Sequence, residues 1–226
     1  MTHILHIDTS GSTGSVMLAA DGVVIASVQN LNERDHAGSI NQMVEDVLKK
    51  GNVGIPDLGA IAVCSGPGSY TGLRIGMATA KGLCYAYDLP LILNSKLELL
   101  FEEADIANNT HLKLVVLPAR IGEYFMAAFD INFNCAIQPH LVTTGNLIKK
   151  INEFINNGVC LYGVLGDDLN IPLLTGVDFY KRENIYVKGW AHKTFNQFLL
   201  TNFSNLADTE PTYLKSVYIQ NSKLKR

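Results

Sequence analysis

Four glycines and a proline crowd residues 65–76, SGPGSYTGLRIG, directly after an apolar run that predicts a buried strand. A glycine-rich turn between a strand and a helix often cradles a phosphate. The spacing here matches neither common nucleotide motif. A dinucleotide fingerprint would need a glycine at position 71, where this chain has Thr71. A P-loop needs glycine directly before lysine, whereas here Lys81 precedes Gly82. A loop that binds some other phosphate at the helix N-terminus stays open as an alternative.

The helix predicted at residues 70–87 is apolar around well over half of its circumference, so it should bury two faces. The strip expected to face the sheet contains Leu73, Met77, Ala80 and Cys84. A second strip contains Gly72, Ile75, Gly76, Thr79 and Leu83. Each glycine costs about 1 kcal/mol relative to alanine inside a helix. Two glycines four positions apart therefore predict that another backbone approaches closely at this strip.

We expect that backbone to belong to a partner protein, with Tyr70 and Ile40 beside the second strip. Packing of the strip against the chain's own helix at residues 36–50 is the alternative. Under the interface hypothesis, the change Gly76→Leu leaves the monomer folded and abolishes dimer formation. Unfolding of that variant would instead indicate internal packing.

Asp8 is the strongest remaining candidate for chemistry, because it ends a strand-like run and precedes a turn rich in Thr and Ser. Asp8, Thr9 and Ser10 could be the remnant of a phosphate-binding turn. The alternative is that the Asp8 carboxylate only braces the turn by accepting hydrogen bonds within it. Ser65 and Ser69 could be imagined as nucleophiles, yet no His or Asp stands in a context that suggests a catalytic triad.

The histidines do not predict a metal site. No two of the six lie four positions apart, as a pair on one helix face would require. His3 and His6 belong to one predicted strand and would point to opposite faces of it. We therefore expect no catalytic residue, no metal and no other cofactor in this chain.

Composition excludes several classes of protein. Hydrophobic residues make up 47% and charged residues 17% of the 226 positions, which is typical of a globular protein. A net charge of −3 argues against unaided binding of nucleic acid. The four cysteines form no C-x-x-C pair, and we expect neither a leader nor a membrane-spanning segment. We expect a reduced, cytoplasmic protein.

The elements that position these residues follow from the periodicity of apolar side chains. Strands are predicted at residues 3–8, 16–22, 23–30, 59–64 and 91–93, and helices at residues 36–50, 70–87 and from residue 95 onward. Asp21-Gly22 predicts a tight hairpin, and Gly51 predicts the end of the first helix. Three antiparallel strands followed by alternating helices and strands is the order of a ribonuclease-H-like lobe.

The second half of the chain is predicted to repeat the first. Residues 113–130 can be aligned with residues 3–21, since both runs have an apolar strand, a small turn and a strand ending in Ala-Ala. Further elements are predicted near residues 137–142, 146–155, 159–164 and 190–200, whereas residues 165–188 are left unassigned. The architecture we expect is α/β, with two tandem lobes at residues 1–108 and 109–226.

Several segments together resemble one family. They are LHIDTS, ERDH, SGPGSYTGLRIGMATAKGL, ARIGEYFMAAF and EPTYLK, and the glycine-rich run is the most specific. This sequence is identified as a member of the TsaB (YeaZ) family. The likeness covers residues 4–95, 119–129 and 210–215 and is thin over residues 130–208. It implies an actin/Hsp70/sugar-kinase-like fold, in which two lobes have mixed sheets flanked by helices.

The resemblance also implies a role in tRNA modification. TsaB-like proteins are non-catalytic paralogues of TsaD, the metal-dependent enzyme that transfers a threonylcarbamoyl group to the adenosine beside the anticodon. They dimerise with TsaD through helices of the first lobe, and the pair recruits the ATPase TsaE. The same surface can form homodimers, and tRNA is reached only through the complex.

Two alternatives remain open. One is an ATP-handling phosphotransferase or hydrolase of the same fold that uses Asp8 and the turn after it. The other is a free-standing homodimer with no enzymatic partner. The family commonly has an Asp where this chain has Pro118, and in kinase relatives an acid there helps to hold metal-bound phosphate. The histidine pair with which a TsaD-like enzyme holds its metal is also missing. The absence of the acid at Pro118 fits a lobe that no longer handles a nucleotide.

Overall fold

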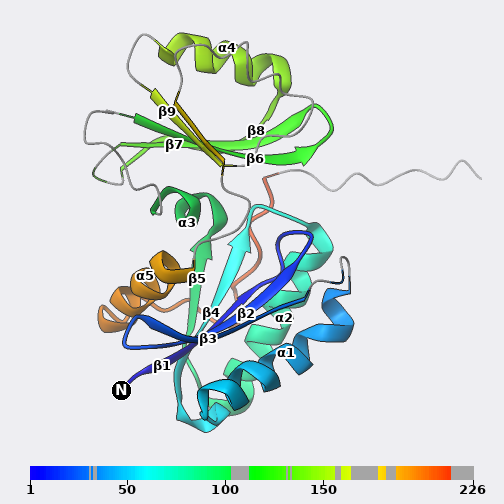
Figure 1. Cartoon of the computed structure of the whole chain (residues 1–226), viewed down its shortest axis with the longest axis vertical. Coiled ribbons are helices and arrows are strands. Elements are labelled where there is room, and N and C mark those ends of the chain that lie inside the picture. The colour runs from blue at the N-terminus through cyan, green and yellow to red at the C-terminus, as the bar shows by residue number, and fades with distance from the viewer. Residues whose placement is uncertain are drawn as a thin grey trace, which may run out of the picture.

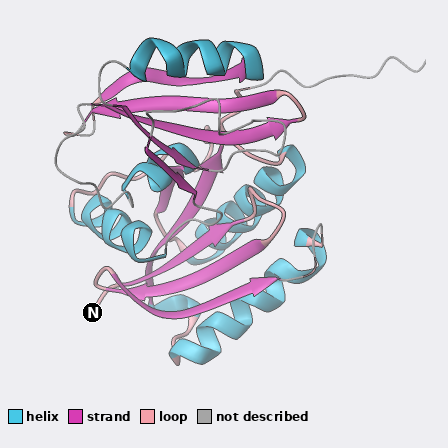
Figure 2. Ribbon diagram, turned by 45° about the horizontal axis from the view of Figure 1, so that its top comes forward, coloured by secondary structure: helices cyan, strands magenta, loops and turns pink. Residues whose placement is uncertain are grey.

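Two five-stranded mixed sheets form the framework of the molecule, one above the other in the view of Figure 1. The computed structural model describes residues 1–30, 32, 35–102, 112–130, 132, 134–155, 159–163, 178–181 and 187–214. When the molecule is turned by 45°, the two sheets are seen as separate layers with helices between and outside them (Figure 2).

The first sheet begins with an antiparallel meander and continues with parallel strands. Its strands are β1 (His3–Asp8), β2 (Gly14–Ala20), β3 (Val23–Asn30), β4 (Leu58–Gly66) and β5 (Leu91–Ser95), in the order β3-β2-β1-β4-β5. Both β4 and β5 run parallel to β1, as a ribonuclease-H-like lobe requires. Asp21 and Gly22 join β2 to β3 with φ of 47° and 80°, the left-handed conformation that a tight hairpin turn needs. The predicted hairpin is confirmed.

Helices cover both faces of this sheet. One face carries α1 (His36–Gly51) and α2 (Tyr70–Tyr87), and a short 3-10 turn (Ile55–Asp57) leads from α1 into β4. Gly51 is still helical, and α1 ends because Asn52 adopts the left-handed conformation at φ 53°. Ser69 caps α2 by accepting a hydrogen bond from the Gly72 N–H at 3.2 Å.

The second sheet repeats the topology of the first. It contains β6 (Leu112–Arg120), β7 (Glu123–Asp130), β8 (Cys135–Thr143), β9 (Val159–Gly163) and β10 (Asp178–Lys181). The order β8-β7-β6-β9-β10 corresponds strand for strand to β3-β2-β1-β4-β5, and α4 (Thr144–Ile155) follows β8 as α1 follows β3. This repetition confirms the predicted tandem lobes. The strand β10 lies in the segment left unassigned by the sequence.

The chain returns to the first sheet at its C-terminal end. Short helix α3 (Lys96–Glu102) lies between the two sheets, where its apolar residues pack against β6 and β7. Helix α5 (Val187–Leu199) lies beside the first sheet (Figure 1), where it contacts β1, β3 and β5. Its Trp190 belongs to the apolar core that contains Ile4 and Met17. The predicted division of the chain at residue 108 assigns α5 to the second lobe, although α5 contacts β1, β3 and β5 of the first sheet.

A membrane-spanning helix is not found in the described part of the chain, where no helix combines the necessary length and apolar character.

Candidate functional site

Three parallel strands, β1, β4 and β5, end at one edge of the first sheet, and Asp8 lies at that edge. The Asp8 Oδ1 atom accepts hydrogen bonds from the Ser10 N–H at 2.8 Å and from the Ser10 hydroxyl at 2.5 Å. Both residues are buried. The carboxylate therefore braces the turn between β1 and β2, which was the alternative to a phosphate-binding role.

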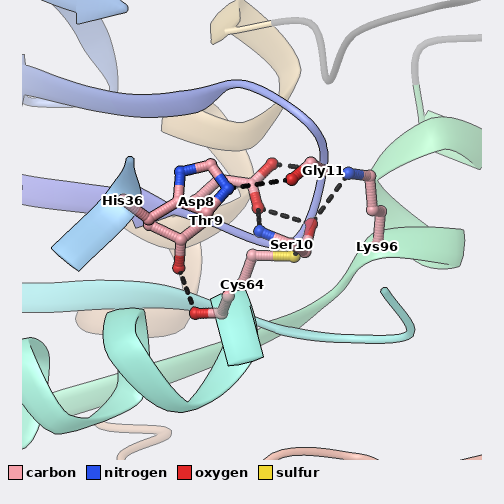
Figure 3. A network of polar contacts seen from close by, with 8 residues as sticks. Asp8, Thr9, Ser10, Gly11, His36, Cys64 and Lys96 are labelled. Carbon is pink, nitrogen blue, oxygen red and sulfur yellow. Dashed lines mark hydrogen bonds and ion pairs between the residues drawn. The ribbon is translucent and has the colours of Figure 1, made fainter. Parts of the chain in front are cut away.

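Lys96 is the residue of this cluster that the sequence did not reveal. Its Nζ donates to the Ser10 Oγ at 2.7 Å and lies 3.7 Å from the Asp8 Oδ2 (Figure 3). The side chains of Lys96 and Asp8 are only 13% and 9% exposed. A signal was available in principle, because Lys96 directly follows β5 and parallel strands end at a common edge of their sheet.

Ser10 cannot serve as a nucleophile of the Ser–Lys type. A hydroxyl has one donor and two acceptor positions. Ser10 donates to Asp8 and accepts from the Lys96 Nζ and, at 3.6 Å, from the Cys64 thiol, so its hydrogen-bonding capacity is used up. The residue is also only 3% exposed. No face of this hydroxyl is left for a substrate.

The other potential nucleophiles near this edge also have structural roles. Burial, together with the negative charge of Asp8, raises the pKa of the Cys64 thiol to about 12, so it is not the thiolate that a reactive cysteine needs. Ser65 is buried and donates to the Asn94 carbonyl at 3.2 Å, while Ser69 is the N-cap of α2. In the described residues, no group of three or more His, Cys, Asp or Glu side chains is arranged to hold a metal ion.

The two glycines of the predicted interface face the chain's own β1–β2 turn. A Cβ added at Gly72 would meet the Thr9 carbonyl oxygen, and one added at Gly76 would meet the Thr9 Oγ1, each at well under 3.0 Å. The Thr9 hydroxyl donates to the Gly72 carbonyl at 2.6 Å, which holds the turn against α2. The prediction that these glycines admit a partner's backbone is wrong, and this packing leads us to expect that Gly76→Leu destabilises the monomer. The intruding segment is the turn, not the helix at residues 36–50.

Other residues of the predicted interface divide between core and surface. Ile40 is 3% exposed and belongs to the core under α1, so its proposed contact with a partner is also wrong. Ile75 and Leu83 are partly buried against that core, and Thr79 is partly exposed. Tyr70 is exposed and stacks on the chain's own C-terminal segment, with its ring 5.0 Å from that of Tyr213.

The face of α2 that points away from the sheet carries no charged side chain along its centre. We call this face the outer strip of α2. It contains the exposed residues Thr71, Ala78, Gly82 and Tyr85 and the partly exposed residues Ile75 and Thr79. A Cβ added at Gly82 would meet nothing within 4 Å, so this glycine, unlike the other two, opens to solvent.

Two cations border the outer strip, and both are held by the C-terminal segment at residues 205–214. The Arg74 Nε donates to the Tyr213 hydroxyl at 3.0 Å, and the guanidinium lies 4.2 Å from the centre of the Tyr70 ring. The Lys81 Nζ donates to the carbonyls of Thr209 at 3.0 Å and Ala207 at 3.4 Å. These contacts hold both positive charges at the border, so the centre of the strip carries no charge.

Comparison with known proteins now identifies the family. The family model described as TsaD, tRNA N6-adenosine threonylcarbamoyltransferase, matches residues 24–216. The tRNA threonylcarbamoyladenosine biosynthesis protein TsaB of Escherichia coli is 37% identical over 131 residues, which are 58% of this chain and 56% of that protein. The chain belongs to the TsaB (YeaZ) family. It spans about half the length of the curated TsaB relatives it matches.

Solved structures extend the likeness of this TsaB-family chain over its whole fold. A Pseudomonas aeruginosa protein described as similar to peptidase YeaZ has a TM-score of 0.75 at 20% identity, with 95% of this chain and all of that chain covered. Lmo2764 of Listeria monocytogenes, to which an N-acetylmannosamine kinase activity is ascribed, has a TM-score of 0.52 at 11% identity and covers 89% of this chain and 100% of its own. These neighbours confirm the predicted actin/Hsp70/sugar-kinase-like fold.

Proposed function

We propose that this TsaB-family chain is a non-catalytic subunit in the formation of threonylcarbamoyladenosine on tRNA. It dimerises with a TsaD-type transferase in the cytoplasm, and the pair recruits a TsaE-type ATPase. The tRNA is reached through the complex, and the same surface allows a homodimer. The relatives' names support the pathway. The observation that supports the role within it is the uncharged outer strip of α2.

The outer strip has the composition of an interface centre. Charged residues are depleted at such centres and aromatic residues are enriched, because desolvating a charge is costly while an aromatic ring buries a large area. Tyr85, at one end of the strip, is 84% exposed, which leaves its ring in water until a partner covers it. Ile75 and Thr79 belong to the outer strip, and Tyr70 contacts Arg74 at its border, so these members of the predicted interface stay within the proposal.

Small residues at the centre of the strip set how closely a partner can approach. Ala78 and Gly82 lie four positions apart on the exposed face, where they remove side-chain bulk from one patch. A helix of the partner can then approach α2 at the short end of the usual range of interaxial distance, about 8–10 Å. The steric argument first made for Gly72 and Gly76 therefore applies instead to the side of α2 that faces solvent.

The β1–β2 turn supports a non-catalytic role. Its carboxylate, hydroxyls and neighbouring thiol are buried and hydrogen-bonded to one another or to the backbone. An active site must instead present its reacting groups to a substrate within hydrogen-bond reach. In this complex the transfer chemistry belongs to the partner, and this chain contributes a surface.

Reconstitution of the reaction tests this function. Transfer to tRNA would be measured with the TsaD-type enzyme and the TsaE-type ATPase of the same cell, with and without this chain. The expected result is no transfer by this chain alone and strong stimulation when it is added to the enzyme. Transfer by this chain alone, or an enzyme equally active without it, contradicts the proposal.

A matched pair of variants locates the effect on the outer strip. Gly82→Arg places a cation at the centre of the strip, whereas Gly145→Arg places the same side chain on α4 of the second lobe. A Cβ at either position meets nothing within 4 Å, so both chains should fold. Burying an unpaired charge costs about 3 kcal/mol, roughly a hundredfold in affinity. Stimulation should be lost with Gly82→Arg at enzyme concentrations near the Kd and kept with Gly145→Arg.

A further inference from the structure

Sugar kinases share this fold, and a kinase needs a divalent cation to hold its nucleotide phosphates. The acidic group at the end of β1 is the only member of the predicted phosphate turn that could ligate such a cation through a carboxylate, the group that hard cations prefer. Whether the turn of this chain fits a metal-bound nucleotide can be judged from what surrounds that carboxylate.

Both oxygens of the Asp8 carboxylate face partners from the same chain. Oδ1 accepts two hydrogen bonds from Ser10, and Oδ2 faces the Lys96 ammonium at 3.7 Å. The same ammonium donates to the Ser10 hydroxyl at 2.7 Å (Figure 3). A Cβ added at Gly11 would lie 3.4 Å from the Lys96 Nζ. A cation beside Asp8 would have to displace this ammonium, because two like charges repel strongly at such short range.

The glycine-rich loop lies directly against the same turn. A Cβ added at Gly68 in the glycine-rich loop would lie under 3.0 Å from the Ser10 carbonyl oxygen, and the Ser69 N–H donates to that oxygen at 2.8 Å. The next residue of the turn is also in contact, since His36 Nε2 lies 3.0 Å from the Gly11 carbonyl oxygen. The glycine-rich loop and the turn therefore close on each other, and the residues present do not fit a metal-bound nucleotide.

We propose that Lys96 is a built-in counter-ion of the β1–β2 turn, whose ammonium takes the place that a divalent cation would take beside Asp8. The turn is thereby closed to metal-bound nucleotide and held in its folded shape without a ligand. This inference concerns residues inside the first lobe and does not depend on the identity of the partner.

Burial makes the pair important to the fold. Both side chains of the pair are nearly excluded from water, so water screens their attraction only weakly. Removing one member leaves the other as an uncompensated charge in a poorly hydrated site. Lys96 is also the first residue of α3, whose Leu97, Leu100 and Phe101 pack against the second sheet. The counter-ion thus ties the turn of the first lobe to the helix that lies between the sheets.

A double-mutant cycle tests the counter-ion role. Thermal unfolding would be measured for wild type, Asp8→Asn, Lys96→Met and the double variant. Lys96→Met should lower the midpoint by roughly 10 °C, because it leaves Asp8 unpaired. The double variant should regain a large part of that loss, since the amide introduced at position 8 keeps an acceptor for Ser10 without the charge. A Lys96→Met chain as stable as wild type, or strictly additive losses, overturns the proposal.

Binding of Mn²⁺ tests the closure of the turn. The concentration of free Mn²⁺, measured by electron paramagnetic resonance, should be the same with wild type and with Asp8→Asn. Lys96→Thr shortens the side chain and frees the space beside the Asp8 carboxylate. The Lys96→Thr variant should therefore bind Mn²⁺, and the additional change Asp8→Asn should abolish that binding. Binding to wild type that Asp8→Asn abolishes, or a Lys96→Thr chain no better than wild type, overturns the proposal. The comparison of wild type with Asp8→Asn needs no Lys96 variant to fold.

Discussion

Gly72 and Gly82 lie on the same helix and have opposite surroundings. Gly72 is buried against the Thr9 carbonyl, whereas Gly82 faces open space. A glycine in a helix lowers stability unless something requires the missing side chain. The structure supplies that reason for Gly72 and Gly76, because the turn enters where their side chains would be. At Gly82 the monomer offers no structural reason for a glycine, and we therefore propose that a partner packs there.

Alanine substitution separates the two kinds of glycine. Gly82→Ala should raise the free energy of unfolding by about 1 kcal/mol through helix propensity alone, which is about 2–4 °C in Tm for a chain of this size. Gly72→Ala should lower Tm by several degrees or more, because its Cβ collides with backbone that has no rotamer to change. The two variants are compared by calorimetry, and a Gly72→Ala chain as stable as wild type would refute the packing role.

Burial of His6 should make the stability of the protein depend on pH. The imidazole is fully buried with its ring 5.0 Å from that of Trp190, and burial lowers its pKa from 6.5 to about 3. Between these values the unfolded chain binds a proton and the folded chain does not. Stability should therefore fall as the pH drops from 6.5 towards 3, by up to about 1.4 kcal/mol per pH unit from this group.

Urea unfolding of wild type and His6→Gln at a series of pH values measures this effect. The carboxylates titrate in both chains, so the difference between the two slopes isolates His6. A shallower slope for His6→Gln below pH 6.5 is the expected result. Identical slopes would mean that the imidazole takes up its proton equally in both states.

At the scale of elements, much of the fold was predictable and the site was not. The helix at residues 70–87 and the strand at residues 3–8 match α2 and β1, because periodicity and flanking turn residues report local structure directly. The glycine spacing correctly indicated a close approach to α2 but could not name what approaches. The pairing of Asp8 with Lys96 joins residues far apart in sequence, so it becomes visible only once the order of β1, β4 and β5 is known.

The end of β5 and helix α5 are joined by one buried amide. The Asn94 Oδ1 accepts from the Trp190 Nε1 at 2.8 Å and from the Thr194 hydroxyl at 3.2 Å, and its Nδ2 donates to Gln197 at 2.7 Å. Asn94→Leu keeps the branching of the side chain and leaves the buried donors of Trp190 and Thr194 unpaired. We expect a loss of about 3 kcal/mol in the free energy of unfolding.

Chemical denaturation followed by fluorescence measures that loss, because Trp190 is the single tryptophan of the chain. Leu93→Ile, a change of shape without a change of polarity on the same strand, serves as the control and should cost less. An Asn94→Leu chain within about 0.5 kcal/mol of wild type would show that the amide is dispensable, since that is the range of neutral substitutions.

At the scale of the whole molecule, the two lobes are not independent folding units. Helix α3 packs against both sheets, and α5 returns from beyond the second sheet to complete the core of the first. The second lobe cannot unfold without disturbing α3, and the first cannot keep its core without residues that follow the second in sequence. Duplication of the ribonuclease-H-like topology has therefore produced a joined unit.

This interdependence predicts a single unfolding transition. Trp190 fluorescence reports the core of the first lobe, and far-ultraviolet circular dichroism reports the helices and strands of both. The two signals should give coincident curves in urea, as a cooperative unit does. Separate transitions would mean that the packing of α3 against the second sheet contributes little.

The central claim is that the outer strip of α2 binds a catalytic partner, and sedimentation velocity of mixtures with the TsaD-type enzyme tests it most directly. Wild type and Gly145→Arg should both form a heterodimer with the enzyme. Gly82→Arg should sediment as a folded monomer beside free enzyme, with the circular dichroism spectrum of wild type. A Gly82→Arg chain that binds the enzyme as tightly as wild type would contradict the claim.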